Sequence, residues 1–185
     1  GSFQLNGSGF GNASTDASLN VSLITVAAWV NVKDTANDYN VVAKTHGSAG
    51  LFGWLLQTHR TNGACFHVSN NTGDASLSAC GGTQDALTAN TWYYIAGTYD
   101  GSTSRTFING NQVASRSITG TMFSNINIPL CIGGSNANCG SGNVNGSIDE
   151  VAVWNRTLSE TEIRNVYKRG VLSLNISVRS CDDSS

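Results

Sequence analysis

Hydrophobic and polar residues alternate with a period of two along most of this chain. The alternation comes in short runs that are separated by clusters of Gly, Asn, Asp and Ser. Because successive side chains of an extended strand point to opposite faces, this pattern predicts a β-sheet protein. The predicted strands are 3–6, 17–22, 23–32, 39–45, 52–58, 64–69, 75–80, 91–100, 104–109, 111–117, 127–133 and 146–155.

Strands of this number and spacing favour two antiparallel sheets packed face to face. The expected fold is therefore an all-β jelly-roll sandwich whose core lies between the two sheets. The clearest connection is the dipeptide Asn109-Gly110, because both central residues of a type I′ turn need a positive φ and this pair tolerates it. We predict a hairpin that joins 104–109 to 111–117.

One segment near the C-terminus has helical periodicity. Ser159 and Glu162 have the spacing of a capping box, in which each side chain bonds the backbone amide of the other, and Leu158 and Ile163 flank it as a hydrophobic staple. Gly170 stands where a left-handed residue would end the helix. We expect one short C-terminal helix of roughly ten residues packed on the sandwich.

Composition and charge narrow the class of protein. The chain has 185 residues, of which 39% are hydrophobic, so it can bury the core of one main domain. We place this domain at 1–170 and treat 171–185, which begins as a further alternating run, as a tail. A net charge of -2 without a basic run argues against nucleic-acid binding. No apolar stretch approaches the roughly 18 residues of a membrane span, so we expect no direct membrane insertion.

The cysteines indicate the compartment. Cys65 and Cys80 flank two strand-like runs that a hairpin would bring together, and Cys131 and Cys139 bracket a short loop, so we predict these two disulfides. Cys181 has no obvious partner. Metal binding is the alternative, but no C-x-x-C pair or His/Cys cluster occurs. Disulfides favour an oxidising environment, and we expect a secreted or cell-surface protein.

Asn-x-Ser/Thr sequons agree weakly with a secreted glycoprotein, since a chain rich in Asn, Ser and Thr also produces them by chance. They lie at Asn6, Asn12, Asn20, Asn70, Asn145, Asn155 and Asn175.

Three stretches, in order, resemble the laminin G-like domains of the concanavalin A-like lectin and glucanase superfamily. They are FQLNGSGFGNASTDASLNVSLITVAAWVNV, TWYYIAGTYDGSTSRTFINGNQV and GSIDEVAVWNRTLSETEI. This chain departs from the family pattern at Asn6, where Asp is usual, and at Tyr93 and Tyr94, where His is frequent. The tail resembles the start of a second sandwich in some multidomain surface proteins. That resemblance would place the partner of Cys181 in a following module of a longer chain.

The resemblance implies a module that binds a glycan or glycoprotein ligand in an adhesive protein, commonly with calcium. Two other roles stay open: a structural spacer of a multidomain surface protein, and an accessory carbohydrate-binding module of a polysaccharide-degrading enzyme. Related sandwiches hydrolyse glycosides with a Glu-x-Asp-x-x-Glu strand, and this pattern is absent. Asp149 and Glu150 are adjacent, so strand alternation would point them to opposite faces. His59 and His67 accompany no catalytic motif. We therefore predict a non-catalytic lectin-like module.

Calcium is the one cofactor that we expect. Asp149 lies in an apolar strand, and the resemblance implies a structural calcium there, with backbone oxygens near Asn6 and Gly7 as further ligands. A turn cap or a salt bridge explains Asp149 equally well. A second position could form on the loop rim, although carboxylates there are more often ordinary turn residues. Its candidate ligands are Asp34, Asp38, Asp74 and Asp85.

Glycan binding needs an exposed aromatic face beside groups that hydrogen-bond sugar hydroxyls. The candidate ligand-binding residues are Trp54, His59, Arg60, Tyr93 and Tyr94. Tyr93 and Tyr94 are neighbours, so only one of them can face the core, and the other lies on the outer sheet surface as a platform or as a cover for the sandwich edge. Trp29, Trp92 and Trp154 lie in strongly apolar strands and are predicted to be core residues.

Overall fold

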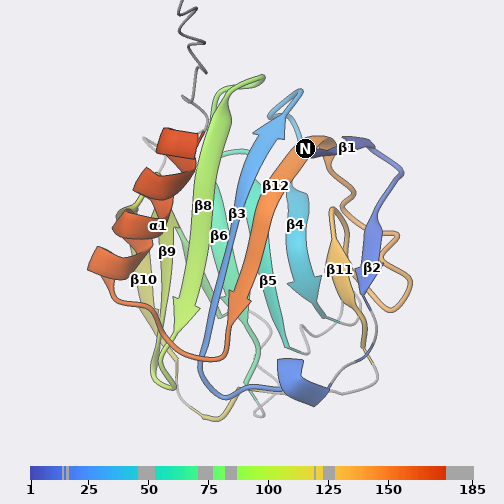
Figure 1. Ribbon diagram of the computed structural model, residues 1–185. Coiled ribbons are helices and arrows are strands. Elements are labelled where there is room, and N and C mark those ends of the chain that lie inside the picture. The colour runs from blue at the N-terminus through green and yellow to red at the C-terminus, as the bar shows by residue number, and fades with distance from the viewer. Residues whose placement is uncertain are drawn as a thin grey trace, which may run out of the picture.

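Twelve strands and a helix after the last strand make up the part of the chain that the computed structural model describes (Figure 1). That part comprises residues 1–13, 15, 17–45, 53–70, 77–81, 87–118, 120–122 and 128–173. The strands form two antiparallel six-stranded sheets, as the alternating pattern predicts. Sheet A has the order β1-β12-β3-β8-β9-β10, and sheet B has the order β2-β11-β4-β5-β6-β7.

The bounds of the elements follow the hydrophobic runs closely. The strands of sheet A are β1 (Phe3–Asn6), β3 (Ile24–Val32), β8 (Trp92–Tyr99), β9 (Thr103–Ile108), β10 (Asn111–Ser117) and β12 (Asn145–Trp154). The strands of sheet B are β2 (Gly11–Ala13), β4 (Tyr39–Lys44), β5 (Trp54–His59), β6 (Gly63–Val68), β7 (Ser78–Cys80) and β11 (Leu130–Ile132). A 3-10 turn, η1, spans Ala17–Leu19, and the helix α1 spans Glu160–Ser173.

The main core lies between the inner faces of the two sheets. Val26 and Ile95 of sheet A are fully buried there with Leu56 and Phe66 of sheet B. The sheets are also linked by hydrogen bonds, because the Thr106 hydroxyl donates to the carbonyl of Ala79 at 2.6 Å. It also accepts the Phe66 amide at 3.1 Å. One edge of the sandwich is thereby held by polar contacts as well as by apolar packing.

The predicted hairpin is present between β9 and β10. Asn109 and Gly110 have φ values of 51° and 79°, so both central residues are left-handed. The Asn109 side chain also accepts the amide of Tyr94 at 3.0 Å, which ties the turn to the neighbouring strand β8.

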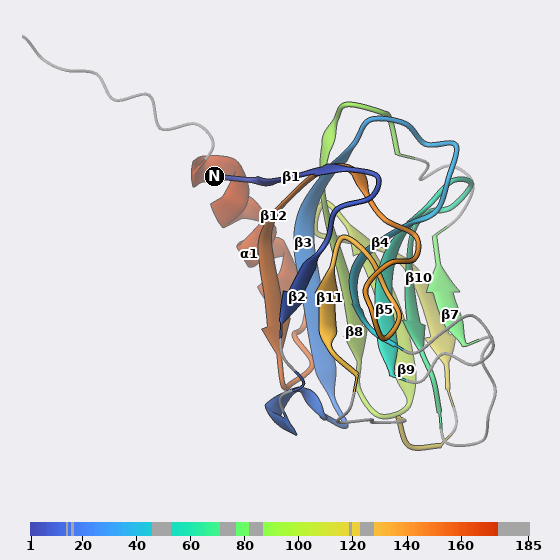
Figure 2. The same cartoon turned by 90° about the vertical axis from the view of Figure 1, so that its right-hand side faces the viewer.

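Helix α1 covers the outer face of sheet A, and Figure 2 shows it on the side of the sandwich away from β5 and β7. The capping box is formed: the Glu162 amide donates to the Ser159 hydroxyl at 3.3 Å, and the Ser159 amide donates to the Glu162 carboxylate at 2.9 Å. Leu158 and Ile163 pack in a second apolar cluster with residues of the sheet. The buried Thr25 hydroxyl fixes the approach to the helix by accepting the Leu158 amide at 2.8 Å.

Two sequence predictions about element bounds are wrong. Residues 17–22 are not a strand, because Ala17–Leu19 form a 3-10 turn, while the short strand Gly11–Ala13 was not predicted. The helix also continues past Gly170 to Ser173, and Gly170 is not among the residues with positive φ. Burial of Val166 and Tyr167 against sheet A supports a longer helix than the glycine position indicated. The rest of the predicted tail, 174–185, lies outside the described residues.

None of the helices among the described residues has the length and apolar character needed to cross a membrane.

Candidate functional site

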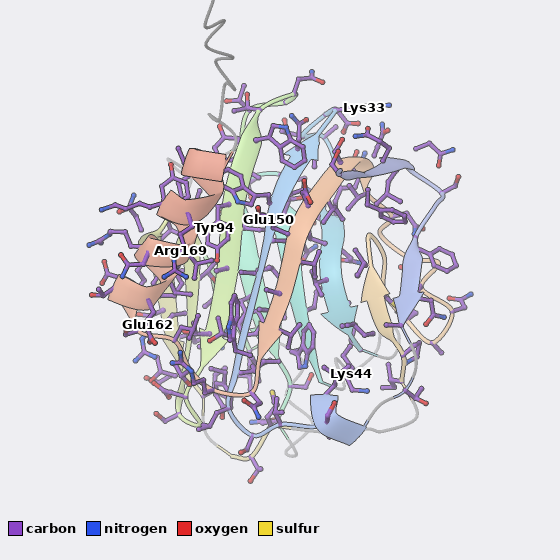
Figure 3. The ribbon with its side chains drawn as sticks, in the orientation of Figure 1. Lys33, Lys44, Tyr94, Glu150, Glu162 and Arg169 are labelled. Carbon is purple, nitrogen blue, oxygen red and sulfur yellow. A yellow bond between two sulfur atoms is a disulfide. The ribbon has the colours of Figure 1, made fainter. Side chains whose placement is uncertain are left out.

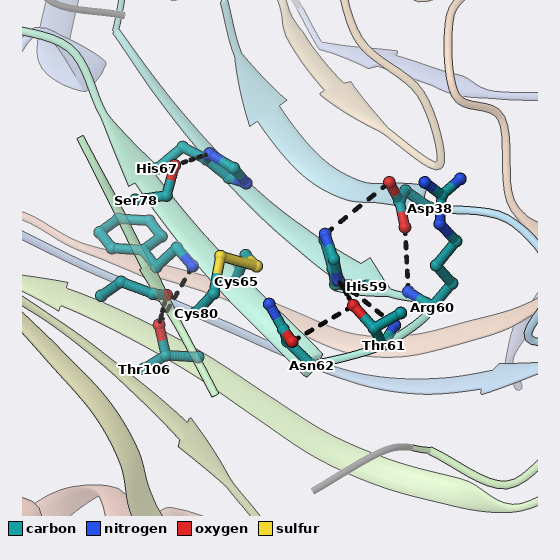
Figure 4. Close-up of a disulfide and its surroundings, with 12 residues drawn as sticks. Asp38, His59, Arg60, Thr61, Asn62, Cys65, His67, Ser78, Cys80 and Thr106 are labelled. Carbon is teal, nitrogen blue, oxygen red and sulfur yellow. Dashed lines mark hydrogen bonds and ion pairs between the residues drawn. A yellow bond between two sulfur atoms is a disulfide. The ribbon is translucent and has the colours of Figure 1, made fainter. Parts of the chain in front are cut away.

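The outer faces of the two sheets differ in character. On sheet A, the outer residues Trp29, Tyr94 and Phe107 are buried with α1 in the second apolar cluster. On sheet B, no described helix covers the outer face. The strands β5, β6 and β7 carry polar side chains there, and we call this the sheet B face (Figure 4). It consists of Gln57, His59, Arg60, His67 and Ser78, with Asp38 at its rim.

Strand alternation explains how these side chains reach one surface. Trp54 and Leu56 of β5 point into the main core. The alternate residues Leu55, Gln57 and His59 therefore face outward. The register pairs Gln57 with Cys65 across the β5–β6 hairpin, and it pairs His67 with Ser78 across β6 and β7. Residues far apart in the sequence thus form two neighbouring rows across three strands, one with Gln57, Cys65 and Cys80 and one with Leu55, His67 and Ser78.

Both predicted disulfides are present. The Cys65–Cys80 bond crosses two directly paired positions of β6 and β7, and it lies within the sheet B face (Figure 4). The Cys131–Cys139 bond closes the loop after β11. A cross-strand bond beside His67 and Ser78 fixes the spacing of the strands that carry them. Cys181 lies outside the described residues.

His67 is a neutral imidazole at physiological pH. Burial lowers its pKa from 6.5 to about 4, and the charge of His59 lowers it further. Its Nδ1 atom lies 2.5 Å from the Ser78 hydroxyl, while its Nε2 atom is buried without a hydrogen-bond partner in the described structure. A neutral imidazole has one donor and one acceptor nitrogen, which suits it to a hydroxyl group.

The His67 pKa predicts a pH dependence of stability. The unfolded chain takes up a proton near pH 6.5, but the folded domain does so only near pH 4, so the free energy of unfolding falls as the pH drops between these values. The expected loss is about 3 kcal/mol. Denaturant unfolding at pH 7, 5.5 and 4 measures it. His67→Gln should flatten the curve over this range, and an equally steep curve in that variant would contradict the assignment.

His59 and Arg60 lie at the end of the sheet B face, where the β5–β6 turn meets the β3–β4 loop. The Thr61 hydroxyl is 3.2 Å from His59 Nδ1, and His59 Nε2 is 4.0 Å from the Asp38 carboxylate. The Arg60 amide donates to Asp38 at 2.9 Å. These contacts hold the imidazole at the rim of the face, while the Arg60 side chain is exposed. His59 and Arg60 are the two predicted ligand-binding residues that the structure brings together.

The aromatic candidates lie elsewhere, and the expectation that they are exposed is wrong. Trp54 is 1% exposed in the main core, because β5 turns this side chain inward. Tyr94 does lie on the outer side of its sheet, but α1 covers it and leaves 1% exposed. Tyr93 packs partly buried against the main core, and its hydroxyl accepts the Thr88 amide at 3.2 Å. These three residues therefore offer no open aromatic platform.

The predicted calcium ligands do not come together. The register of β1 and β12 pairs Asn6 with Asn145 and Phe3 with Ile148, so Asp149 lies near the opposite end of β1 from Asn6 and Gly7. The four residue-to-residue steps from Asn145 to Asp149 span about 13 Å along the strand, whereas calcium ligands lie at about 2.3 to 2.6 Å from the ion. The Asn6 side-chain oxygen is also occupied by the amides of Ser8 and Gly9. This ligand set does not fit calcium.

The second calcium position has no support in the described residues. Asp34 accepts the Tyr39 hydroxyl at 2.7 Å, which lowers its pKa, while Asp38 binds the Arg60 amide. Asp74 and Asp85 lie outside the described residues. Within the described part of the chain, one group of three potential metal ligands occurs, Cys65, His67 and Cys80, and its two cysteines are joined in a disulfide. Calcium binding stays a prediction.

The β12 strand contains a bulge that changes the expected directions of its acidic residues. The pairing with β3 shifts between Asp149 and Ala152, and Glu150 has a φ of 48°. A bulge sets two residues opposite one and re-aims a side chain. Asp149 and Glu150 consequently line the same hollow, so the prediction that they lie on opposite faces is wrong.

The sequons differ in accessibility. Asn6, Asn12 and Asn155 are exposed, whereas Asn70 is 5% exposed and could not carry a glycan in this fold. Asn20 and Asn145 are half-buried, and the Asn145 side chain donates to Asp34 at 3.4 Å. Asn175 lies outside the described residues.

Sequence reasoning missed Gln57, Ser78 and the role of His67 in this face. The sequence did contain a signal for this face. Gln57 and His59 are two residues apart in a strand-like run, so their side chains point to the same side of the sheet, and the run ends at a short turn with Gly63. Gly63 has a φ of 72°, as a tight hairpin turn requires. Pairing the two strands through that turn would have placed His67 beside them.

Comparison with known proteins points to one superfamily. The family model of the concanavalin A-like lectin/glucanases superfamily matches residues 6–164. None of the curated proteins matches this sequence significantly.

Solved structures with a similar fold include carbohydrate-binding domains. One is the CBM40 domain of the Ruminococcus gnavus IT-sialidase, bound to α2,3-sialyllactose, with 16% identity over 90% of this chain and 96% of that chain and a TM-score of 0.69. Another is domain 4 of AbnA, a GH43 extracellular arabinanase from Geobacillus stearothermophilus, in complex with arabinotriose, with 16% identity over 90% and 76% and a TM-score of 0.67.

A third similar structure is the binding domain of Paraclostridial Mosquitocidal Protein 1, with 17% identity over 92% of this chain and 47% of that chain and a TM-score of 0.64. At these identities the similarity concerns the fold alone.

Proposed function

This chain belongs to a laminin G-like family of the concanavalin A-like lectin/glucanases superfamily, and on that premise we propose that it is a non-catalytic module that binds glycans through the sheet B face. One observation carries the proposal. The outer face of sheet A is buried under α1, whereas the sheet B face presents amide, imidazole, guanidinium and hydroxyl groups that no helix of the described residues covers.

The chemistry of the sheet B face suits sugar hydroxyls. Gln57 offers an amide donor and acceptor, the partly exposed His59 offers ring nitrogens at the rim, and Arg60 offers donors only. Sugar recognition depends on several such groups that are fixed in position. Here the strands and the Cys65–Cys80 disulfide supply the fixed geometry.

The folds of the similar structures support this proposal. The sialidase CBM40 domain and the arabinanase domain were solved with bound oligosaccharides, and each comes from a glycan-degrading enzyme. This origin favours an accessory role, in which the module delivers a separate enzyme to its polysaccharide. The two disulfides support an extracellular setting for either role.

A glycan array with matched variants tests the proposal. In the Gln57→Ala/His59→Ala double variant, the loss of two hydrogen-bonding side chains should weaken the strongest array signal about tenfold. Gln112→Ala is the control, because Gln112 is an exposed glutamine on β10 of the other sheet. The melting temperatures of both variants should stay close to that of the unaltered domain.

Other outcomes of this array would count against glycan binding at this face. Uniformly flat signals for the unaltered domain would favour the structural spacer instead. An equal loss in Gln112→Ala would show that the signal does not depend on the sheet B face. Release of a shortened glycan during incubation would contradict the non-catalytic role.

A further inference from the structure

A small hollow lies on the other side of the sandwich, between α1 and the outer face of sheet A. It has a volume of about 30 Å³ and is lined by Trp29, Trp92, Asp149, Glu150 and Gly170. A cavity of about 10–15 Å³ is enough for one water molecule. The hollow therefore has room for a small polar group such as a hydroxyl, and we call it the bulge hollow because the β12 bulge forms one wall.

Two buried donors beside the bulge hollow have no hydrogen-bond partner. Trp29 is 6% exposed and lines the hollow, and its indole Nε1 makes no hydrogen bond in the described structure. The Tyr94 hydroxyl is also buried without a partner, and its ring lies 5.7 Å from that of Trp29. Buried polar groups nearly always have a partner, which is often a water or a ligand atom. We therefore expect an acceptor atom to bind the Trp29 N–H in the hollow.

Acceptors surround the same space. Asp149 and Glu150 both line the hollow, and neither forms an ion pair with any described residue. Figure 3 shows Glu150 and Tyr94 on the helix-covered side of sheet A. Burial raises the pKa of Tyr94, and the negative charge of Glu150 raises it further.

Gly170 lies close to both the donor and the acceptor. A Cβ atom added to Gly170 would lie 3.1 Å from the Glu150 Oε2 atom, and it would overlap the Trp29 Nε1 atom. A hydroxyl oxygen that enters the hollow beside Gly170 could accept from the indole N–H and donate to the carboxylate. A hydroxyl group can do both, whereas an ammonium group cannot accept and a carboxylate would be repelled.

We propose that the bulge hollow is a second glycan subsite, which takes a hydroxyl group of a neutral sugar between the Trp29 N–H and the Glu150 carboxylate. The proposal rests on the proposed function in one respect, namely that the domain binds glycans. It adds a site on the opposite sheet from the sheet B face, and it names the sugar class, because two carboxylates disfavour anionic sugars.

An adjacent surface could hold the rest of the sugar. A larger hollow of about 230 Å³ also contacts Asp149 and Glu150, and it is lined by Phe3, which is 45% exposed, and by Val151. Ligand pockets combine apolar walls with a few polar groups, as this hollow does. The exposed Phe3 ring offers an apolar face to the C–H side of a sugar.

Nuclear magnetic resonance of the tryptophan indole N–H groups tests the proposal. The probes are arabinotriose as a neutral sugar and α2,3-sialyllactose as an anionic one, each at about 20 mM, where a site with a Kd of about 1 mM would be nearly full. Arabinotriose should shift the Trp29 indole signal in a saturable way. In Glu150→Gln the affinity at this signal should fall about tenfold, since a hydrogen bond to a charged group is lost. Glu160→Gln, an exposed glutamate at the start of α1, should behave as the unaltered domain.

Gly170→Ala provides a second variant, because its methyl group would occupy the hollow. It should abolish the shift of the Trp29 signal. Because the methyl group overlaps the buried Trp29 indole, it should also lower the melting temperature, so Glu150→Gln is the decisive variant. A Trp29 signal that does not move while signals of β5–β7 move would overturn the subsite and leave the proposed function intact. If neither sugar moved the Trp29 signal, the subsite would be overturned, and the glycan array would decide the proposed function separately. An equal response to both sugars, or an unchanged affinity at the Trp29 signal in Glu150→Gln, would also overturn the subsite.

Discussion

Replacing Trp54 with alanine should lower the free energy of unfolding by about 3–5 kcal/mol, the cost of removing a large aromatic side chain from a packed core. Trp54 is 1% exposed between the sheets, so nothing from solvent can fill the space that it leaves. Denaturant unfolding followed by circular dichroism measures the loss. This would be one of the two largest effects of any change considered for this domain.

Trp54→Phe separates a core role from a ligand-binding role. The Trp54 indole N–H has no hydrogen-bond partner among the described residues, so phenylalanine loses no polar contact there and keeps most of the apolar volume. We expect Trp54→Phe to fold with a much smaller loss and to bind glycans like the unaltered domain. Normal stability combined with lost glycan binding would show that Trp54 contacts the ligand after all.

Reducing both disulfides should lower the free energy of unfolding by about 5 kcal/mol. The Cys65–Cys80 bond spans 15 residues and the Cys131–Cys139 bond spans 8. Loop-closure entropy gives about 3 kcal/mol for the first and about 2.5 kcal/mol for the second. Because domains of this size have a total stability of about 5–15 kcal/mol, the reduced protein should be close to unfolding at 37 °C.

Two serine double variants measure how much of this loss of stability comes from each disulfide. Cys65→Ser/Cys80→Ser should lose somewhat more stability than Cys131→Ser/Cys139→Ser, because its loop is longer. It should also weaken glycan binding, since the bond holds β6 and β7 under His67 and Ser78. An unfolding curve that is the same with and without a reducing agent would contradict a structural role for both bonds.

Local signals in the sequence determined the features that were predicted correctly. The Asn109-Gly110 turn needs only its own backbone conformation, and the Ser159/Glu162 capping box needs only one helical turn. Each of these two signals is contained within a few neighbouring residues. The two-sheet architecture follows from alternation repeated over many strands, which does not depend on any single assignment.

The errors arose where a distant segment decides the outcome. In β5 both Trp54 and Leu55 are apolar and buried, so alternation alone does not tell which of them faces the main core. The direction of Tyr94 could be inferred, but its burial depends on α1, which lies far along the chain. The direction of the Glu150 side chain could not be predicted, because the bulge is set by the pairing of β12 with β3. A glutamate with positive φ has no sequence signature.

In the candidate site, too, some residues could be predicted from local sequence and others depend on distant segments. His59 and Arg60 were named from their chemistry, whereas Gln57 and Ser78 become part of the site only through the register of β5, β6 and β7. The predicted calcium ligands do not come together for a related reason. The position of Asn6 opposite Asn145 is set by the register of β1 with β12.

Glycan binding through the sheet B face is tested most directly by a chemical-shift map of the labelled domain with the glycan that gives the strongest array signal. The expected result is a cluster of shifted amide signals on β5, β6 and β7, centred on His59 and His67. A map without shifts on these strands, or with shifts confined to the loops at the opposite end of the sandwich, would contradict it.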